Sequence, residues 1–283
     1  MIMNQIKTVI LLGLMTGLFL GIGSFWGQSG LAIALVFSIV MNFGAYWFSD
    51  KLILAMYRAK EVTAKEQPKL YKIVKQVSEL AGVPMPKIYI IPGEFSNAFA
   101  TGRSPKHAAI AVTNGILNLL SEDELKGVIA HEISHIKNRD TLIQSISATI
   151  AGVISYIAHM AGWAAMFGGF GGDRDNKGGN GLELLVLAIL TPILALLIQM
   201  AISRSREYLA DESAAKTLHT GSTLASALGK LEGDISRKPL RPVSTTETTA
   251  HLFIANPFNA KGIVNMFSTH PPMKERIRRL KEM

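Results

Sequence analysis

Cysteine is absent from this 283-residue chain. Its absence excludes disulfide bonds, thiolate-ligated zinc and thiol catalysis, so any metal site has to use histidine and carboxylate side chains. Charge is also scarce, because only 18% of the residues are charged while 48% are hydrophobic, and mean hydropathy is +0.27. So apolar a composition predicts membrane-spanning segments in addition to any water-exposed domain.

Basic residues are missing from two long blocks of the chain. Of the 29 Lys and Arg, one lies in residues 1–50, thirteen in 51–140, two in 141–203 and thirteen in 204–283. The net charge of +8 is therefore confined to two polar blocks, as the positive-inside rule expects of a membrane protein. A nucleic-acid-binding stripe would not leave such gaps, and we expect a lipid bilayer and no nucleic acid as partner.

Four uncharged or nearly uncharged apolar runs, Thr8–Trp26, Leu31–Phe48, Leu142–Phe167 and Leu182–Ile202, are each long enough to cross a bilayer core of about 30 Å at about 1.5 Å per residue. A cleaved signal peptide is the alternative for the first run. Its length, the lack of a small-residue cleavage pattern and the second run directly after it argue against cleavage. The runs pair into two hairpins, the second closed by the glycine-rich loop Gly168–Gly181.

The predicted fold class is membrane α-helical plus α+β, with four transmembrane helices in two hairpins and a polar domain that carries a small β-sheet. Both termini and the polar domain are expected on the cytoplasmic side. The predicted parts are the first hairpin (1–50), the first piece of the polar domain (51–141), the second hairpin (142–203) and the second piece of that domain (204–283).

The sequence GVIAHEISHIKNRD holds His131, Glu132 and His135 in the spacing H-E-x-x-H. Side chains four residues apart share one face of a helix, so both imidazoles can reach a single Zn²⁺ while Glu132 flanks it. Ser121 and Glu124 match a capping box and predict where this helix begins. A helix with two ordinary histidines is the alternative.

A catalytic zinc needs a third protein ligand and an open position for water. Glu207, on the next cytoplasmic helix, is the best candidate for that ligand. Asp211, one turn later, suits a supporting role in which it accepts the free ring N–H of a ligand histidine, by preference His131. The alternative for both acids is a solvated helix face paired with Arg204 or Arg206.

Three short strands are predicted between Lys87 and Val112, before the metal helix. An edge strand beside a metal site can bind an extended peptide through backbone hydrogen bonds. Asn97, Ala98 and Phe99 are the candidates for such substrate binding, and an ordinary core strand is the alternative.

These residues predict a zinc endopeptidase with one Zn²⁺ per chain. Zinc lowers the pKa of a bound water to about 7, and Glu132 would take its proton and pass it to the leaving amine. One alternative is a membrane scaffold or chaperone with a structural zinc. Another is a metal transporter, for which the predicted spans offer only His159 and Glu183.

The motifs HEISH, SRSREYLAD and THPPMKERI, together with the four apolar runs, resemble the HtpX-type membrane zinc metalloproteases, which are related to the CAAX prenyl proteases. The resemblance implies a gluzincin-like domain in the bacterial inner membrane, with zinc on His131, His135 and Glu207 and catalysis by Glu132. It also implies quality control of misfolded or damaged membrane proteins, often under stress. CAAX proteases are larger, so prenyl-peptide processing is not expected.

The same resemblance implies that His270 and Arg276 lie near the active site. They are expected to bind the developing oxyanion or to position the substrate, with a loop clamp and a surface arginine as the alternative. The expected substrates are membrane-proximal segments of membrane proteins or unfolded polypeptides. Nothing in the sequence indicates an oligomeric state.

Overall fold

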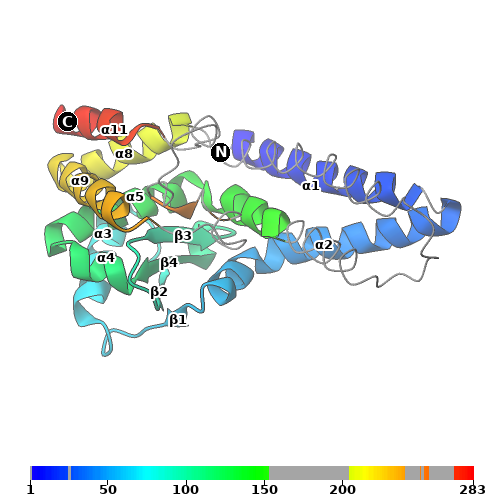
Figure 1. Ribbon diagram of the computed structural model, residues 1–283, viewed down its shortest axis with the longest axis horizontal. Helices are drawn as coiled ribbons and strands as arrows, with labels where there is room; N and C mark the ends of the chain where they lie inside the picture. The colour runs from blue at the N-terminus through cyan, green and yellow to red at the C-terminus, as the bar shows by residue number, and fades with distance from the viewer. Residues whose placement is uncertain (1, 25–26, 153–203, 240–248, 250–251, 255–270) are drawn as a thin grey trace, which may run out of the picture.

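The computed structural model describes most of the chain outside the second predicted hairpin (Figure 1). The described residues are 2–24, 27–152, 204–239, 249, 252–254 and 271–283. Most of the third predicted span, the glycine-rich loop and the fourth predicted span therefore lie outside the described residues.

Two N-terminal helices form a long hairpin. Helix α1 (Ile2–Gly23) and helix α2 (Gly27–Met56) lie side by side (Figure 1), and Asn42 of α2 donates a hydrogen bond of 2.8 Å to Thr16 of α1. Among the described residues, α2 alone is long and apolar enough to cross a membrane, with a mean hydropathy of 1.9 over its best window; the apolar part of α1, Gln5–Gly21, is shorter.

Helix α2 does not stop where its apolar run ends at Phe48 but continues to Met56. The charged residues that follow Phe48 do not break a helix. The last turns also have an apolar side, because Ile53 and Leu54 are buried in a cluster that includes Phe99 of the sheet. One continuous helix therefore joins the apolar hairpin to the folded domain.

The sheet has four strands in the order β1-β2-β4-β3. They are β1 (Lys60–Glu61), β2 (Lys87–Ile91), β3 (Ala98–Gly102) and β4 (Ala108–Thr113). Strands β2 and β4 are parallel, and the other two pairs are antiparallel. The three predicted strands are present, while the two-residue β1 was not predicted. Within this sheet β3 is an edge strand, and it is the strand that lies against the metal helix.

Helix α5 (Glu122–Asn138) lies at the centre of the domain. Figure 1 shows it between the sheet and helices α8 and α9, with α11 beyond them. The other helices are α3 (Pro68–Ala81), α4 (Asn114–Leu119), α8 (Arg204–Leu218), α9 (Ser222–Arg237) and α11 (Met273–Lys281). Residues 141–152 form the described part of a further helix, which follows α5 directly.

The predicted capping box at the start of α5 is confirmed. Ser121 Oγ accepts from the backbone N–H of Glu124, and Glu124 Oε2 accepts from the backbone N–H of Ser121 at 2.8 Å. The same carboxylate is buried and also accepts hydrogen bonds from Ser226 and Lys230 of α9, each 2.7 Å long. Glu124 therefore fixes the start of the metal helix to its neighbour.

Candidate metal centre

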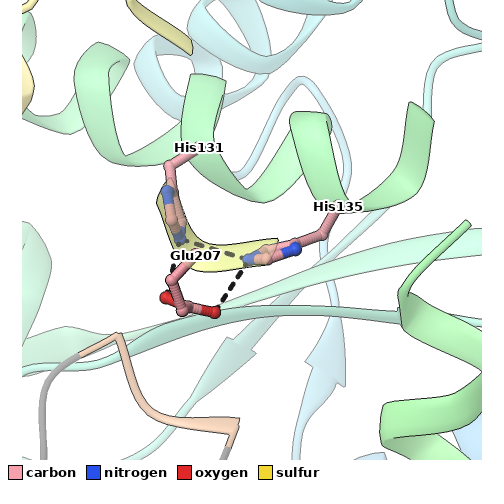
Figure 2. A group of neighbouring side chains, drawn as sticks. All are labelled: His131, His135 and Glu207. Carbon is pink, nitrogen blue, oxygen red and sulfur yellow. Dashed lines mark hydrogen bonds and ion pairs between the residues drawn. The ribbon is translucent and has the colours of Figure 1, made fainter. Parts of the chain in front are cut away.

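Three buried side chains from two helices converge beneath the sheet edge. His131 and His135 lie one turn apart on α5, and Glu207 lies in the first turn of α8 (Figure 2). The two Nε2 atoms are 3.2 Å apart, Oε1 of Glu207 lies 3.5 Å from Nε2 of His135, and Oε2 lies 3.7 Å from Nε2 of His131. The structure thus brings together all three predicted ligands, and each is at most 4% exposed.

This arrangement fits zinc. Donor atoms about 2.0–2.1 Å from a tetrahedral Zn²⁺ lie about 3.4 Å from one another, close to the three distances observed. The donor chemistry agrees as well, because two ring nitrogens and a carboxylate oxygen that face one another at this range can hold a cation between them. Within the described part of the chain the set offers three donors, which leaves a fourth position for water, as a catalytic site requires.

Asp211 lies where the four-residue spacing on α8 predicted. Its Oδ1 is 2.9 Å from Nδ1 of His131, on the side of the ring opposite the metal position. Burial alone would raise the pKa of this carboxyl, but Arg276 and His131 outweigh burial and hold its pKa below the ordinary value. Asp211 is therefore an ionised acceptor that suits an N–H at Nδ1 of His131.

Arg276 lies behind the ligands, in a fully buried position. Its Nε and Nη2 donate to the two oxygens of Asp211, each at 2.8 Å, and its Nη1 donates to the backbone carbonyl of Ile254 at 3.0 Å. Nη1 also lies 3.5 Å from Oε2 of Glu207. The contacts of Arg276 are thus with the ligand set and its support. His270, the other residue that the resemblance pointed to, lies outside the described residues.

Glu132 lies between the ligands and the sheet. Its Oε2 accepts a hydrogen bond of 2.8 Å from the backbone N–H of Ala100 in β3, and it lines one pocket together with His131, His135 and Glu207. Burial is the main cause that raises the pKa of its carboxyl above the ordinary value, while the two histidines lower it. A carboxylate so placed reaches both the metal position and the edge strand.

The backbone of β3 alternates between its partner strand and its free edge. The carbonyl of Asn97 accepts from the N–H of Thr113, so this residue is turned toward β4. In an antiparallel pair the next residue turns the other way, and the bond from Ala100 to Glu132 shows that direction directly. Ala98 and Ala100, which are both buried, therefore turn their backbone groups away from β4, toward the edge that packs against α5.

The side chains of the predicted substrate residues are buried. Oδ1 of Asn97 accepts from the backbone N–H of Ile254 at 3.2 Å, and the ring of Phe99 packs against that of Tyr57 with centroids 5.6 Å apart. Asn97 and Phe99 thus support the strand, Phe99 also lines the pocket of the ligands, and Ala98 turns its backbone groups toward the edge.

Sequence reasoning missed one charged residue and one apolar segment at the site, and it named Arg206 only as a possible partner of Glu207 or Asp211. Asp140 lies with Oδ2 3.1 Å from Nδ1 of His135, and Arg206 lies 3.7 Å from the other oxygen of Asp140. The segment Leu252–Ile254 lines the same pocket as the ligands. The helix pattern indicated neither, because Asp140 follows the end of α5 and Leu252–Ile254 stands in a polar, proline-containing stretch.

A family model, peptidase family M48, matches residues 64–283 of the chain. Curated proteins named protease HtpX homolog are similar over almost their whole length. The protein of Persephonella marina is 54% identical over 285 residues, which cover 99% of this chain and 98% of that protein. The protein of Syntrophobacter fumaroxidans is 51% identical, with 99% of each chain covered, and that of Pyrococcus furiosus is 50% identical, with 98% and 95% covered.

A solved structure is similar in fold. The crystal structure of S. mikatae Ste24p matches with a TM-score of 0.53 at 21% identity, over 99% of this chain. The chain spans 66% of the length of that protein. At this identity the likeness concerns the fold alone.

Proposed function

The chain belongs to peptidase family M48 and is a zinc metalloprotease, and we propose that it is a membrane-anchored endopeptidase that cleaves misfolded or damaged membrane proteins close to the membrane surface. One observation carries this proposal. Glu132 stands between the ligand set and the backbone of the edge strand, so that a polypeptide bound along that edge would meet the metal and the acid–base group together.

The chemistry divides between the ion and the chain. A bound Zn²⁺ supplies Lewis acidity and lowers the pKa of the water that it holds. His131, His135 and Glu207 would hold the ion, and Asp211 with Arg276 orients the ring of His131. Glu132 accepts a proton from the attacking water and delivers it to the leaving amine. Its burial raises the pKa of its carboxyl, which suits a group that has to gain and lose a proton in each cycle.

The edge of β3 supports an extended substrate. An added strand would pair with the outward backbone groups of Ala98 and with the carbonyl of Ala100, whose N–H is bonded to Glu132, and backbone pairing gives affinity without demanding a particular sequence. Such tolerance suits an enzyme whose substrates share a misfolded state rather than a motif. The original substrate candidates Asn97 and Phe99 then act by holding this edge in place.

The short distance between the apolar part of α2 and the metal pocket supports membrane-proximal cleavage. The first charges after its apolar run are Asp50 and Lys51, and Tyr57 follows Lys51 by six residues, or about 9 Å at 1.5 Å per residue. Tyr57 contacts Phe99, which lines the metal pocket. The exposed Trp47 stacks under Arg103 at 4.6 Å, as expected of an aromatic residue at the headgroup level. The pocket then lies roughly 10 Å beyond the bilayer core.

The positive-inside rule puts the polar parts and both termini in the cytoplasm, and a multi-pass inner-membrane location follows. Protease-accessibility mapping tests this topology. A protease added on the side opposite the cytoplasm should cleave within residues 168–181. Cleavage of this loop in sealed vesicles that expose only their cytoplasmic side would refute the topology.

The central experiment compares the wild type with Glu132→Ala in detergent. Zinc content should stay near one ion per chain in both, while peptide hydrolysis is abolished in the variant. Glu122→Ala, an exposed change on the same helix, should leave both unchanged. A membrane scaffold with a structural zinc predicts instead a closed four-ligand site and biological activity that survives Glu132→Ala.

A further inference from the structure

Both ligand histidines face a carboxylate on the ring nitrogen that points away from the metal position. His131 has Asp211 at 2.9 Å, and His135 has Asp140 at 3.1 Å. The first carboxylate comes from α8 and the second from the chain directly after α5. The metal centre therefore has two separate carboxylate supports, one for each imidazole.

The end of α5 places Asp140 against the ring. Arg139 adopts the left-handed conformation with φ 60° and ψ 35°, and the backbone N–H of Asp140 then donates to the carbonyl of His135 at 3.0 Å. This tight helix end turns residue 140 back over the last turn of the helix. The carboxylate thus returns to the ring of the residue five positions before it, in a site where Asp140 is only 1% exposed.

A buried cation accompanies this carboxylate. Nη1 of Arg206 lies 3.7 Å from Oδ1 of Asp140, and both side chains are largely buried. A buried carboxylate requires such a counter-charge to stay ionised. Arg206 directly precedes Glu207 on α8, so the helix that provides the third metal ligand also provides the partner of Asp140.

The geometry selects one form of the imidazole. A carboxylate oxygen accepts hydrogen bonds, so Asp140 is placed to favour the form in which the Nδ1 of His135 carries the proton. In the neutral ring Nε2 then has a free lone pair, and Nε2 is the atom directed at His131 and Glu207. The other tautomer would turn an N–H toward the metal position and prevent ligation.

We propose that Asp140 is a positioning residue of the metal centre, which with Asp211 holds both imidazoles in the tautomer and orientation that zinc needs, and which Arg206 keeps in place. The inference rests on the zinc site of the proposed function and adds a second support to it. Loss of an outer carboxylate on a ligand histidine typically costs about 10–100-fold in metal affinity.

The test measures metal binding and not only turnover. The full-length chain in detergent is freed of metal and titrated with Zn²⁺ against a chelator of known affinity, and the visible spectrum of the Co²⁺-loaded chain reports the ligand geometry. Asp140→Ala should bind zinc about 10–100-fold more weakly than the wild type and show a changed cobalt spectrum. Asp123→Ala, an exposed change of equal charge in the first turn of α5, should match the wild type.

A second variant covers the case in which Asp140→Ala does not fold. Asp140→Asn keeps the size of the side chain, but its single oxygen can face His135 only if its NH₂ faces Arg206, so its zinc affinity should fall about 3–10-fold. At saturating zinc the KM of both folded variants should stay near the wild-type value, because Asp140 is not among the residues that line the pocket, whereas kcat should fall with the changed ligand geometry.

Wild-type zinc affinity and an unchanged cobalt spectrum in either folded variant would overturn the proposed role of Asp140. A wild-type chain that itself fails to bind zinc would refute the proposed function, and this inference with it. The two failures are therefore distinguishable in one set of titrations.

Discussion

Arg276 donates two hydrogen bonds to Asp211, from Nε to Oδ2 and from Nη2 to Oδ1, each 2.8 Å long. This fork-to-carboxylate geometry is specific to arginine, because a lysine ammonium cannot present two parallel N–H donors. Asp211 in turn faces His131, so a residue near the C-terminus controls the orientation of a ligand on α5 through one intermediate.

Replacement of Arg276 should therefore weaken the metal site. Arg276→Ala leaves the buried charge of Asp211 unpaired and should destabilise the fold by about 3–5 kcal/mol. Arg276→Lys should retain part of that stability but still bind zinc at least several-fold more weakly. Thermal unfolding and chelator competition measure the two effects. Arg278→Ala, an exposed change on the same helix, is the control, and equal effects of the two alanine variants would contradict this account.

Removal of the third ligand should weaken zinc binding more than replacement of a residue that supports a ligand, such as Asp211 or Arg276. The loss of zinc affinity in Glu207→Ala should exceed the roughly 10–100-fold loss that is typical when a residue behind a metal ligand is removed. Zinc content after dialysis should also fall. Glu212→Ala, on the same helix and paired with Lys216, should retain a full complement of zinc. Full zinc occupancy in the Glu207 variant would move the third ligand elsewhere in the chain.

Zinc affinity should rise with pH. In the metal-free chain burial lowers the pKa of His135, but Asp140, Glu207 and Glu132 outweigh burial and raise this pKa to about 9. The proton must leave before the ring can bind zinc, so affinity should increase about tenfold per pH unit up to about pH 9 and then level off. Chelator titrations between pH 6 and 10 measure the slope. A zinc affinity that does not change with pH would contradict this prediction. His107→Gln, at an exposed histidine, should leave the slope unchanged.

The same raised pKa has a consequence for the metal-free fold. Protonated His135 gains from its carboxylate neighbours, and that stabilisation is complete below the unfolded pKa of about 6.5. It is lost as the pH rises through about 9. The melting temperature of the metal-free chain should therefore fall across this window, and zinc should suppress the fall.

Glu124 should matter for stability and not for chemistry. Glu124→Ala removes the capping box and the bonds from Ser226 and Lys230, which should lower the free energy of unfolding by about 2–3 kcal/mol. Burial opposes the ionised form, but the hydrogen bonds outweigh burial and lower the pKa of Glu124 to about 2. The contribution of ionised Glu124 to the free energy of unfolding is thus present above the ordinary pKa of a glutamate and lost as the pH falls toward 2. Glu122→Ala, at an exposed position, should change the melting temperature little.

If a substrate pairs with β3 as an added strand, its N–H groups point alternately toward β3 and away from it, and peptide substrates can test this. N-methylation of a substrate residue whose N–H pairs with β3 should raise KM about 5–10-fold, the cost of one hydrogen bond of about 1 kcal/mol. N-methylation of the adjacent residues, which point away from the strand, should have little effect. A methylation scan of one peptide measures this directly, and equal effects at all positions would argue against strand addition.

The sequence was sufficient to predict relations between residues of the same helix. The spacing of His131 and His135, and of Glu207 and Asp211, implies shared faces, because every α-helix has the same period. The capping box marked the start of α5 for the same reason. These relations do not depend on what the helices pack against.

What sequence reasoning missed depends on unusual backbone or on distant packing. Asp140 reaches His135 because Arg139 adopts a left-handed conformation that usually falls to glycine or asparagine. The two residues of β1 are too few to form a pattern. Arg276 was expected near the reacting atoms, yet its target, Asp211, lies 65 residues earlier in the chain, and only the packing of α11 against α8 brings them together.

The contact between Arg276 and Asp211 joins parts of the site that are made at different times. Residues from Asn97 to Arg276 take part in the site and its support, so a nascent chain has the H-E-x-x-H helix long before the guanidinium that steadies it. Translation must carry Arg276 out of the ribosome before Asp211 has its partner. Until then the ring of His131 lacks one of the contacts that orient it.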